Sequence, residues 1–228
     1  LLPLSSACIG FTTLLLLFLE WDIHSGRMRY DTMQPNQSIA YISDVAAHRL
    51  KPLFIAGSIS SSTLFNIAFI SDRWRTCGPF ETVLRQKVPT SLAVLLVSAG
   101  SVALCCLAGF DISHFPRLHT AFLVLFIFGY LSSGIFVSWE YYRLDQCRNG
   151  ILRLSFCTKA FLFTVEAILG TMFIAAQDRS DYDLGAILEW IMATIFYFYI
   201  LSFSLDFLPG EHDNHSPSPH RHRGFRNI

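Results

Sequence analysis

The chain has 228 residues, of which 52% are hydrophobic and only 15% are charged, and its formal net charge at pH 7 is zero. This composition is more apolar than that of a soluble domain, so we expect a protein that crosses a membrane several times. A neutral chain has no excess of basic residues for binding nucleic acid. The sequence contains no phosphate loop, nucleophile elbow or zinc signature, and we expect neither a cofactor nor a metal.

Six apolar segments are long enough to cross a bilayer as helices, which takes roughly 20 residues each. They cover about residues 1–19, 53–70, 89–107, 120–139, 160–176 and 184–208. The fourth is the clearest, because no residue from Thr120 to Trp139 carries a formal charge. The sequence therefore predicts an all-α bundle of six transmembrane helices over residues 1–209. The remaining residues, 210–228, are rich in His, Ser, Pro and Arg and predict a disordered tail.

The distribution of basic residues predicts the orientation of the bundle. The second and fourth loops and the tail together hold eleven Lys and Arg residues, whereas the other three loops hold six. Because loops rich in Lys and Arg stay in the cytosol, both termini are predicted to be cytosolic. The sequon at Asn36 then faces the lumen or the outside and can be glycosylated, while the sequon at Asn214 faces the cytosol and stays unmodified.

Three separate segments on the predicted outer side carry polar residues that could converge. The candidates are Ser43, Asp44, Asp111, His114, Arg117, His119 and Glu189. One interpretation is a site at the level of the lipid headgroups, with Arg117 contacting a phosphate and the His and Asp side chains moving a proton. The other is a hydrogen-bond network that fastens the loops to the bundle. The five-residue spacing of His114 and His119 does not suit a metal site on a helix.

Ionisable residues inside the predicted spans are costly and need a partner or a cavity. Glu166 lies near the middle of the fifth span. It is expected either to be protonated or hydrogen-bonded to Asn66 and the serines of the second span, or to hold a lipid headgroup or a proton. Asp206, at the cytosolic end of the sixth span, is expected to pair with Arg or Lys from an adjacent loop.

The basic cytosolic loops are candidates for contact with a partner or with anionic lipids. Within the loop 140–159, Arg148 and Arg153 are the residues we expect to dock a partner protein. The six cysteines do not suggest a disulfide framework, because three lie in or beside apolar runs and three in the predicted cytosolic loops. Palmitoylation of Cys147 or Cys157 is an alternative use of the loop cysteines.

Four ordered blocks resemble the FRAG/DRAM/SFK family, and most closely its fungal SFK-type members. They are YISDVAAHRLKPLFIAG (41–57), FPRLHTAFLVLFIFGYLSSGIFVSWEYYRL (115–144), LRLSFCTKAFLF (152–163) followed by Glu166, and GAILEWIMATIFYFYILSFSLDFLP (185–209). The resemblance implies a six-span plasma-membrane protein that acts without catalysis. It would support a phosphatidylinositol 4-kinase complex and influence lipid asymmetry and sterol retention. An endoplasmic reticulum or Golgi location is the alternative.

The same resemblance aligns individual residues with family motifs. Ser43 and Asp44 fall on an ISD-like element, His119 on a His that opens the fourth span, Glu189 on a Glu-Trp pair, and Asp206 on an acidic helix end. An enzyme that remodels the lipid of GPI anchors is a second hypothesis, with His119 and Asp44 or Asp111 as acid and base. A transporter or lipid scramblase that uses Glu166 is a third, although the two halves show no inverted repeat.

Overall fold

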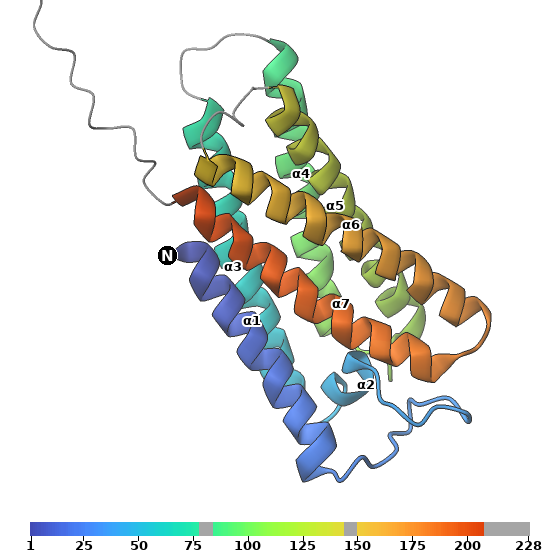
Figure 1. Ribbon diagram of the computed structural model, residues 1–228. Coiled ribbons are helices and arrows are strands. Elements are labelled where there is room, and N and C mark those ends of the chain that lie inside the picture. The colour runs from blue at the N-terminus through green and yellow to red at the C-terminus, as the bar shows by residue number, and fades with distance from the viewer. Residues whose placement is uncertain (78–83, 144–149, 208–228) are drawn as a thin grey trace, which may run out of the picture.

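The structure is a computed structural model, which describes the backbone of residues 1–77, 84–143 and 150–207 and the side chains of 1–74, 88–139 and 153–206. Six long helices make up most of it: α1 (Leu2–Leu19), α3 (Lys51–Cys77), α4 (Leu84–Gly109), α5 (Pro116–Arg143), α6 (Gly150–Asp178) and α7 (Tyr182–Ser202). A π-helical turn, Glu20–His24, extends α1, and a 3₁₀ turn, Phe203–Phe207, extends α7. A five-residue helix, α2 (Ile42–Ala46), lies between α1 and α3 (Figure 1).

The six long helices are long and apolar enough to cross a membrane. The candidate spans are Leu2–His24, Lys51–Trp74, Val88–Gly109, Pro116–Trp139, Arg153–Asp178 and Tyr182–Asp206. The described residues form no strand, and the prediction of an all-α, six-span membrane bundle is confirmed. Pro89 does not open its helix but lies five residues inside α4. It removes one backbone N–H donor near the helix start, which a helix of 26 residues tolerates.

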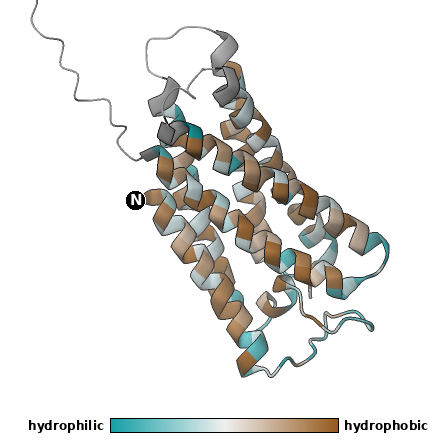
Figure 2. Cartoon of the chain, viewed as in Figure 1, coloured by the Kyte–Doolittle hydropathy of each residue, from teal (hydrophilic) through white to brown (hydrophobic). Residues whose placement is uncertain are grey.

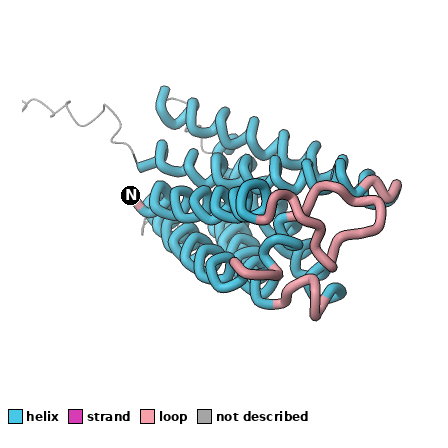
Figure 3. The backbone as a smooth tube through the Cα atoms, turned by 90° about the horizontal axis from the view of Figure 1, so that it is seen from below, coloured by secondary structure: helices cyan, strands magenta, loops and turns pink. Residues whose placement is uncertain are grey.

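The long helices pack in a ring. α1 packs against α3 and α7, α3 against α4, α4 against α5, and α6 against α7, whereas α5 and α6 pack much less closely against each other. The N-terminus lies at the opposite end of the bundle from α2 (Figure 1). The described loops gather at the end of the bundle where α2 lies (Figure 3). We call this end of the bundle the α2 end. The ring therefore has one loosely packed seam, between α5 and α6.

Small and hydroxyl-bearing residues fill the close contacts between helices. Ser6 of α1 and Ser61 of α3 donate hydrogen bonds to each other's backbone carbonyl, at 2.7 and 2.9 Å. Many other large apolar side chains are exposed on the outside of the bundle, and Figure 2 shows apolar residues along the whole length of the helices. Phe128 and Phe161, for example, are 62% and 67% exposed. This arrangement suits a lipid solvent, in which close approach and interhelical hydrogen bonds, rather than burial of apolar area, hold helices together.

Candidate functional site

The α2 end is closed by a folded first loop, and Asp44 is its centre. This carboxylate is 1% exposed and accepts hydrogen bonds from Thr32 Oγ1 at 2.5 Å, Gln37 Nε2 at 2.9 Å and the backbone N–H of Tyr41 at 3.0 Å. Because the bond to Tyr41 closes a capping box, Asp44 also fixes the start of α2. Its two oxygens are therefore committed to organising the loop.

Side chains of α7 hold this loop against the bundle. Glu189 Oε2 accepts the N–H of Ile42, the first residue of α2, at 2.7 Å, and Trp190 Nε1 donates to the carbonyl of Ala40 at 2.9 Å. Nearly two turns earlier, Asp183 Oδ1 accepts the backbone N–H groups of residues 38 and 39 at 2.5 and 2.9 Å. The Glu-Trp pair of α7 thus serves as an anchor for α2.

Tyr41 connects the same loop to α6. Gln177 Nε2 donates a hydrogen bond to the Tyr41 hydroxyl at 3.0 Å. Burial raises the pKa of Tyr41 to about 12, against the lowering effect of the bond from Gln177, so the phenol stays protonated at neutral pH. With this contact, one loop reaches α2, α6 and α7 and spans the seam between α5 and α6.

A groove of about 620 Å³ follows that seam. Its wall on α5 runs from His119 to Leu131, its wall on α6 runs from Ala167 to Asp178, and residues of the first loop and α2 cover the end between them. The groove ends toward the middle of the bundle where the ring of Phe163 packs on Gly134, so closely that a Cβ at this glycine would lie 2.7 Å from the ring.

The groove changes character along its length. At the α2 end its lining is polar and includes Thr32, Gln34, Gln37, Ser43, Asp44, His119, Thr120, Gln177 and Asp178. Toward the middle of the bundle the lining is almost entirely apolar and includes Val124, Ile127, Phe128, Leu131 and Ile174. Val124 and Ile174 are 60% and 62% exposed, so the apolar walls continue into the surface that faces lipid.

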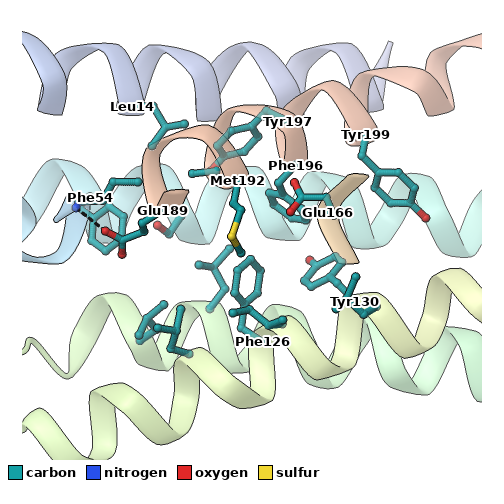
Figure 4. A pocket seen from close by; sticks show the side chains of 18 of the residues that line it. Leu14, Phe54, Phe126, Tyr130, Glu166, Glu189, Met192, Phe196, Tyr197 and Tyr199 are labelled. Carbon is teal, nitrogen blue, oxygen red and sulfur yellow. Dashed lines mark hydrogen bonds between the residues drawn. The ribbon is translucent and has the colours of Figure 1, made fainter. Parts of the chain in front are cut away.

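A second, smaller cavity of about 140 Å³ lies deeper in the bundle (Figure 4). It shares Leu123, Ile127, Leu131 and Glu189 with the groove, so the two spaces adjoin. Its other lining side chains are mostly apolar and include several aromatic rings, among them Phe126, Tyr130, Phe196 and Tyr197. A cavity of this size and apolar lining suits a small apolar group rather than a whole lipid.

Glu166 of α6 points into this inner cavity, and its Oε1 atom is buried without a hydrogen-bond partner among the described residues (Figure 4). Asn66, one of its expected partners, instead donates to the carbonyl of Ser62 at 3.2 Å and accepts from Ser98 at 3.1 Å. Asn66 therefore joins α3 to α4. The expected hydrogen bond between Glu166 and Asn66 is therefore not made, whereas a protonated carboxyl and a site for a lipid headgroup or a proton both stay predictions.

The predicted outer cluster divides into two groups and one isolated residue. Ser43, Asp44, His119 and Glu189 all line the groove. Asp111 and His114 form a separate network with Lys51, the first residue of α3. Arg117 is exposed and does not line the groove, and its contact with a phosphate stays a prediction.

In the separate network, Asp111 Oδ2 pairs with the ammonium group of Lys51, and Asp111 Oδ1 accepts from the His114 backbone N–H at 2.8 Å and from its ring at 2.9 Å. Burial alone would raise the pKa of Asp111, but the hydrogen bonds from Lys51 and His114 outweigh it and hold the pKa well below its usual value. The network ties the loop between α4 and α5 to the start of α3.

His119 is 5% exposed, and its Nδ1 bonds to the carbonyl of Phe110 at 2.9 Å. A carbonyl can only accept, so Nδ1 carries the proton of this bond. Its bond to a carbonyl, rather than to either candidate carboxylate, differs from the acid–base pairing that a hydrolytic site would use. Within the described residues no group of three or more His, Cys, Asp and Glu side chains is placed to hold a metal ion.

At the opposite end of the bundle, Asp206 pairs with Lys159, a residue that lies within α6 rather than in the preceding loop. Ser155 donates to the same carboxylate at 2.6 Å, and Lys159 lies 4.2 Å from the ring centroid of Phe203. Arg153 is exposed near the start of α6, whereas Arg148 lies outside the described residues. Asn36 is exposed on the first loop.

Several residues that build the site were not among the sequence candidates. Lys51, Gln177 and Asp183 each make a contact between segments that are far apart in the chain. Trp190, the second residue of the Glu-Trp pair, also donates a hydrogen bond from its indole to the first loop. The sequence pattern that could have identified these residues is a polar side chain at the end of an apolar segment. Most transmembrane helices share that pattern, so it does not single out residues of a site.

These features define a multi-pass membrane protein built as a ring of six helices, with a lateral groove beneath a folded loop. The family model described as "Frag1/DRAM/Sfk1/Cwh43P N-terminal domain" matches residues 1–210, and the chain belongs to this family. Neither the curated proteins nor the solved structures give a significant match. The family match does not separate the branches of the family, so the resemblance to its fungal SFK-type members stays a prediction.

Proposed function

We propose that this protein is a non-enzymatic regulator of membrane lipids and that it binds a lipid in the groove between α5 and α6. The observation that carries this proposal is the groove itself, which is polar at the α2 end and apolar toward the middle of the bundle. That order of polarity matches a lipid lying with its head at the membrane surface and its chains in the hydrocarbon layer. Its volume of about 620 Å³ lies within the range of ligand sites, roughly 300–1,000 Å³.

Binding rather than catalysis is supported by the hydrogen bonds of the candidate acid and base groups. Asp44 organises the first loop with both oxygens, and Asp111 pairs with Lys51 and His114. A carboxylate held in this way is a poor general base, because taking a proton breaks the bonds that place it. The groove thus offers a lipid a place to lie without an obvious group to attack it.

Filling the groove tests the binding step. Gly170 is buried on the α6 wall, and a Cβ built on it meets nothing within 4 Å, so Gly170→Leu adds a side chain into open space. We expect this variant to purify with at most about a tenth of the lipid that the wild type retains, measured by mass spectrometry of extracted lipids. The added side chain occupies space that the lipid needs, and a loss of about 1.4 kcal/mol in binding free energy already lowers the affinity tenfold.

Gly109→Leu is the matched control, because a Cβ at Gly109 also meets nothing within 4 Å and this residue does not line the groove. Equal lipid retention by wild type and both variants would contradict the proposal.

The regulatory role is proposed from family membership together with the resemblance to SFK-type members. We propose that the protein resides in the plasma membrane, supports a phosphatidylinositol 4-kinase complex there, and influences lipid asymmetry and sterol retention.

Arg153 is exposed on α6 at the end opposite α2, where a cytosolic partner could reach it. Replacing Arg148 and Arg153 together by Glu is expected to lower kinase recruitment, scored by microscopy, while leaving the amount of protein unchanged. Unchanged recruitment would remove this docking surface.

Acute depletion of the protein separates the regulator from the GPI-remodelling enzyme. A reporter measures phosphatidylinositol 4-phosphate at the plasma membrane, and mass spectrometry measures GPI-anchor lipids in the same cells. The regulator predicts a fall in the phosphoinositide with unchanged GPI lipids. The reverse pattern would support remodelling chemistry centred on His119.

A further inference from the structure

Building on the proposed lipid-binding function, we propose that the groove selects a lipid whose head is uncharged and donates hydrogen bonds through hydroxyl groups, as in diacylglycerol, and rejects anionic phospholipids. The charges and the hydrogen-bond roles of the side chains at its polar end carry this inference.

Acidic side chains line the groove without a Lys or Arg among them. They are Asp44, Asp178 and Glu189, and no Lys or Arg is among the described lining residues. The nearby basic residues do not line the groove. Arg179 follows Asp178 and is exposed, and Arg29 donates to the backbone carbonyl of Gln34 at 2.5 Å. Lys51 pairs with Asp111, and Arg117 is exposed. A phosphate in the groove would therefore meet carboxylates and no cation. Phosphate sites in proteins use the opposite arrangement, with Arg, Lys or several N–H groups directed at the oxygens.

Three of the hydroxyl groups that line the groove have already donated their one proton. Thr32 donates to Asp44 at 2.5 Å, Thr120 to the carbonyl of residue 116 at 3.0 Å, and Thr171 to the carbonyl of residue 168 at 2.7 Å. A hydroxyl that has donated once keeps its lone pairs and can only accept a further bond. These three groups thus favour a ligand that brings its own O–H donors.

Glu189 adds a stronger acceptor at the junction of the groove and the inner cavity. Its Oε2 accepts from the N–H of Ile42 at 2.7 Å, and among the described residues its second oxygen has no hydrogen-bond partner (Figure 4). A lipid hydroxyl can donate to this free carboxyl oxygen, whereas a phosphate oxygen would find no N–H donor here, because the N–H of Ile42 is already bonded to Glu189. The carboxyl that anchors α2 is therefore also suited to select the lipid head.

A pair of probes that differ only in the phosphate tests this selection. Photoactivatable diacylglycerol and photoactivatable phosphatidic acid with identical acyl chains are presented to the full-length protein in phosphatidylcholine nanodiscs. We expect diacylglycerol to label the wild type at least about tenfold more than phosphatidic acid, with the label on peptides of α5 or α6, because juxtaposed like charges disfavour a partner strongly. Gly170→Leu should abolish labelling, and Gly109→Leu should leave it intact.

A change of charge at the polar end provides a gain-of-function arm. Thr120→Lys places an ammonium group at the groove, and it is expected to raise phosphatidic acid labelling at least about fivefold relative to diacylglycerol. Leu118→Lys adds the same charge two residues away, on an exposed side chain outside the groove, and should leave the ratio unchanged. Size-exclusion profiles matched to wild type show that both variants are folded.

The possible outcomes distinguish this inference from the proposed function. If phosphatidic acid labels the wild type as well as diacylglycerol does, and Gly170→Leu abolishes both, the groove binds lipid but the selection for an uncharged head is wrong. If neither probe labels the wild type, lipid binding in the groove is itself refuted, and the selection with it.

Discussion

Buried charges in this protein are stabilised by specific partners, and Lys159 shows the cost of removing one. Its side chain is 5% exposed and that of its partner Asp206 is 2% exposed, so the ion pair is shielded from solvent. An unpaired charge in such a place is costly, whereas replacing both members by apolar residues is often tolerated.

Lys159→Met is therefore expected to destabilise the protein by roughly 3–5 kcal/mol, because it leaves the Asp206 carboxylate buried without its cation. Thermal unfolding of the purified protein in detergent measures the loss. The double variant Lys159→Met/Asp206→Leu should recover much of it, and Arg153→Met, on the exposed side of the same helix, should change little. A double variant that is less stable than Lys159→Met would contradict this account.

Asp111 gives a prediction that depends on pH. Because its pKa is lower in the folded protein than the ordinary 3.8, the carboxylate adds stability above about pH 4 and loses it as the pH falls toward the folded-state pKa. Asp111→Asn should cost about 2 kcal/mol at pH 7, the scale of a hydrogen bond to a charged group.

Unfolding midpoints of the wild type and Asp111→Asn are measured from pH 7 down to pH 3. The difference between the two midpoints should narrow below about pH 4, where protonation of the wild-type carboxylate begins to remove its contribution to stability. A gap of constant size over that range would show that Asp111 does not stabilise the fold through its charge.

At the scale of a single element, α2 depends on its surroundings. It has five residues, and an isolated helix of that length does not persist in water. Nucleating a helix costs more free energy than the hydrogen bonds of a single turn recover. Glu189 of α7 accepts the first N–H of α2, Trp190 bonds Ala40 just before it, and α1 packs against α2 as well. The position of the first loop therefore depends partly on a helix about 150 residues away.

Glu189→Ala should release α2, because it removes the acceptor for the first N–H of that helix. We expect faster hydrogen exchange in residues 38–46, by about tenfold, with little change in α3 or α4. Glu189→Gln keeps an acceptor oxygen and should stay close to the wild type. Equal exchange in Glu189→Ala and wild type would show that the other contacts of the loop suffice.

For the whole molecule, the arrangement of six helices in a ring with one open seam determines where a ligand can enter. A seam between α5 and α6 opens sideways toward the hydrocarbon layer, so a lipid can reach the groove without crossing water. The first loop covers only the polar end of that path. The orientation of the ring in the membrane then decides which leaflet supplies the lipid.

Glycosylation tests that orientation. Asn36 is exposed on the loop at the α2 end, and the distribution of basic residues predicts that this end faces the lumen or the outside. We expect an endoglycosidase-sensitive band that disappears in Asn36→Gln and persists in Asn214→Gln. A band abolished by Asn214→Gln instead would reverse the topology and assign the groove to the cytosolic leaflet.

The amino-acid sequence determined the class of the fold, because membrane-spanning helices must be long and apolar throughout and that property is local. It also indicated Asp44, His119 and Glu189 as residues of interest, since polar groups beside apolar segments are conspicuous. Only the tertiary structure decided that these three line one groove while Asp111 and Arg117 do not. The reason is physical: the groove exists because two helices fail to pack, and the tightness of packing between distant segments depends on all their facing side chains together.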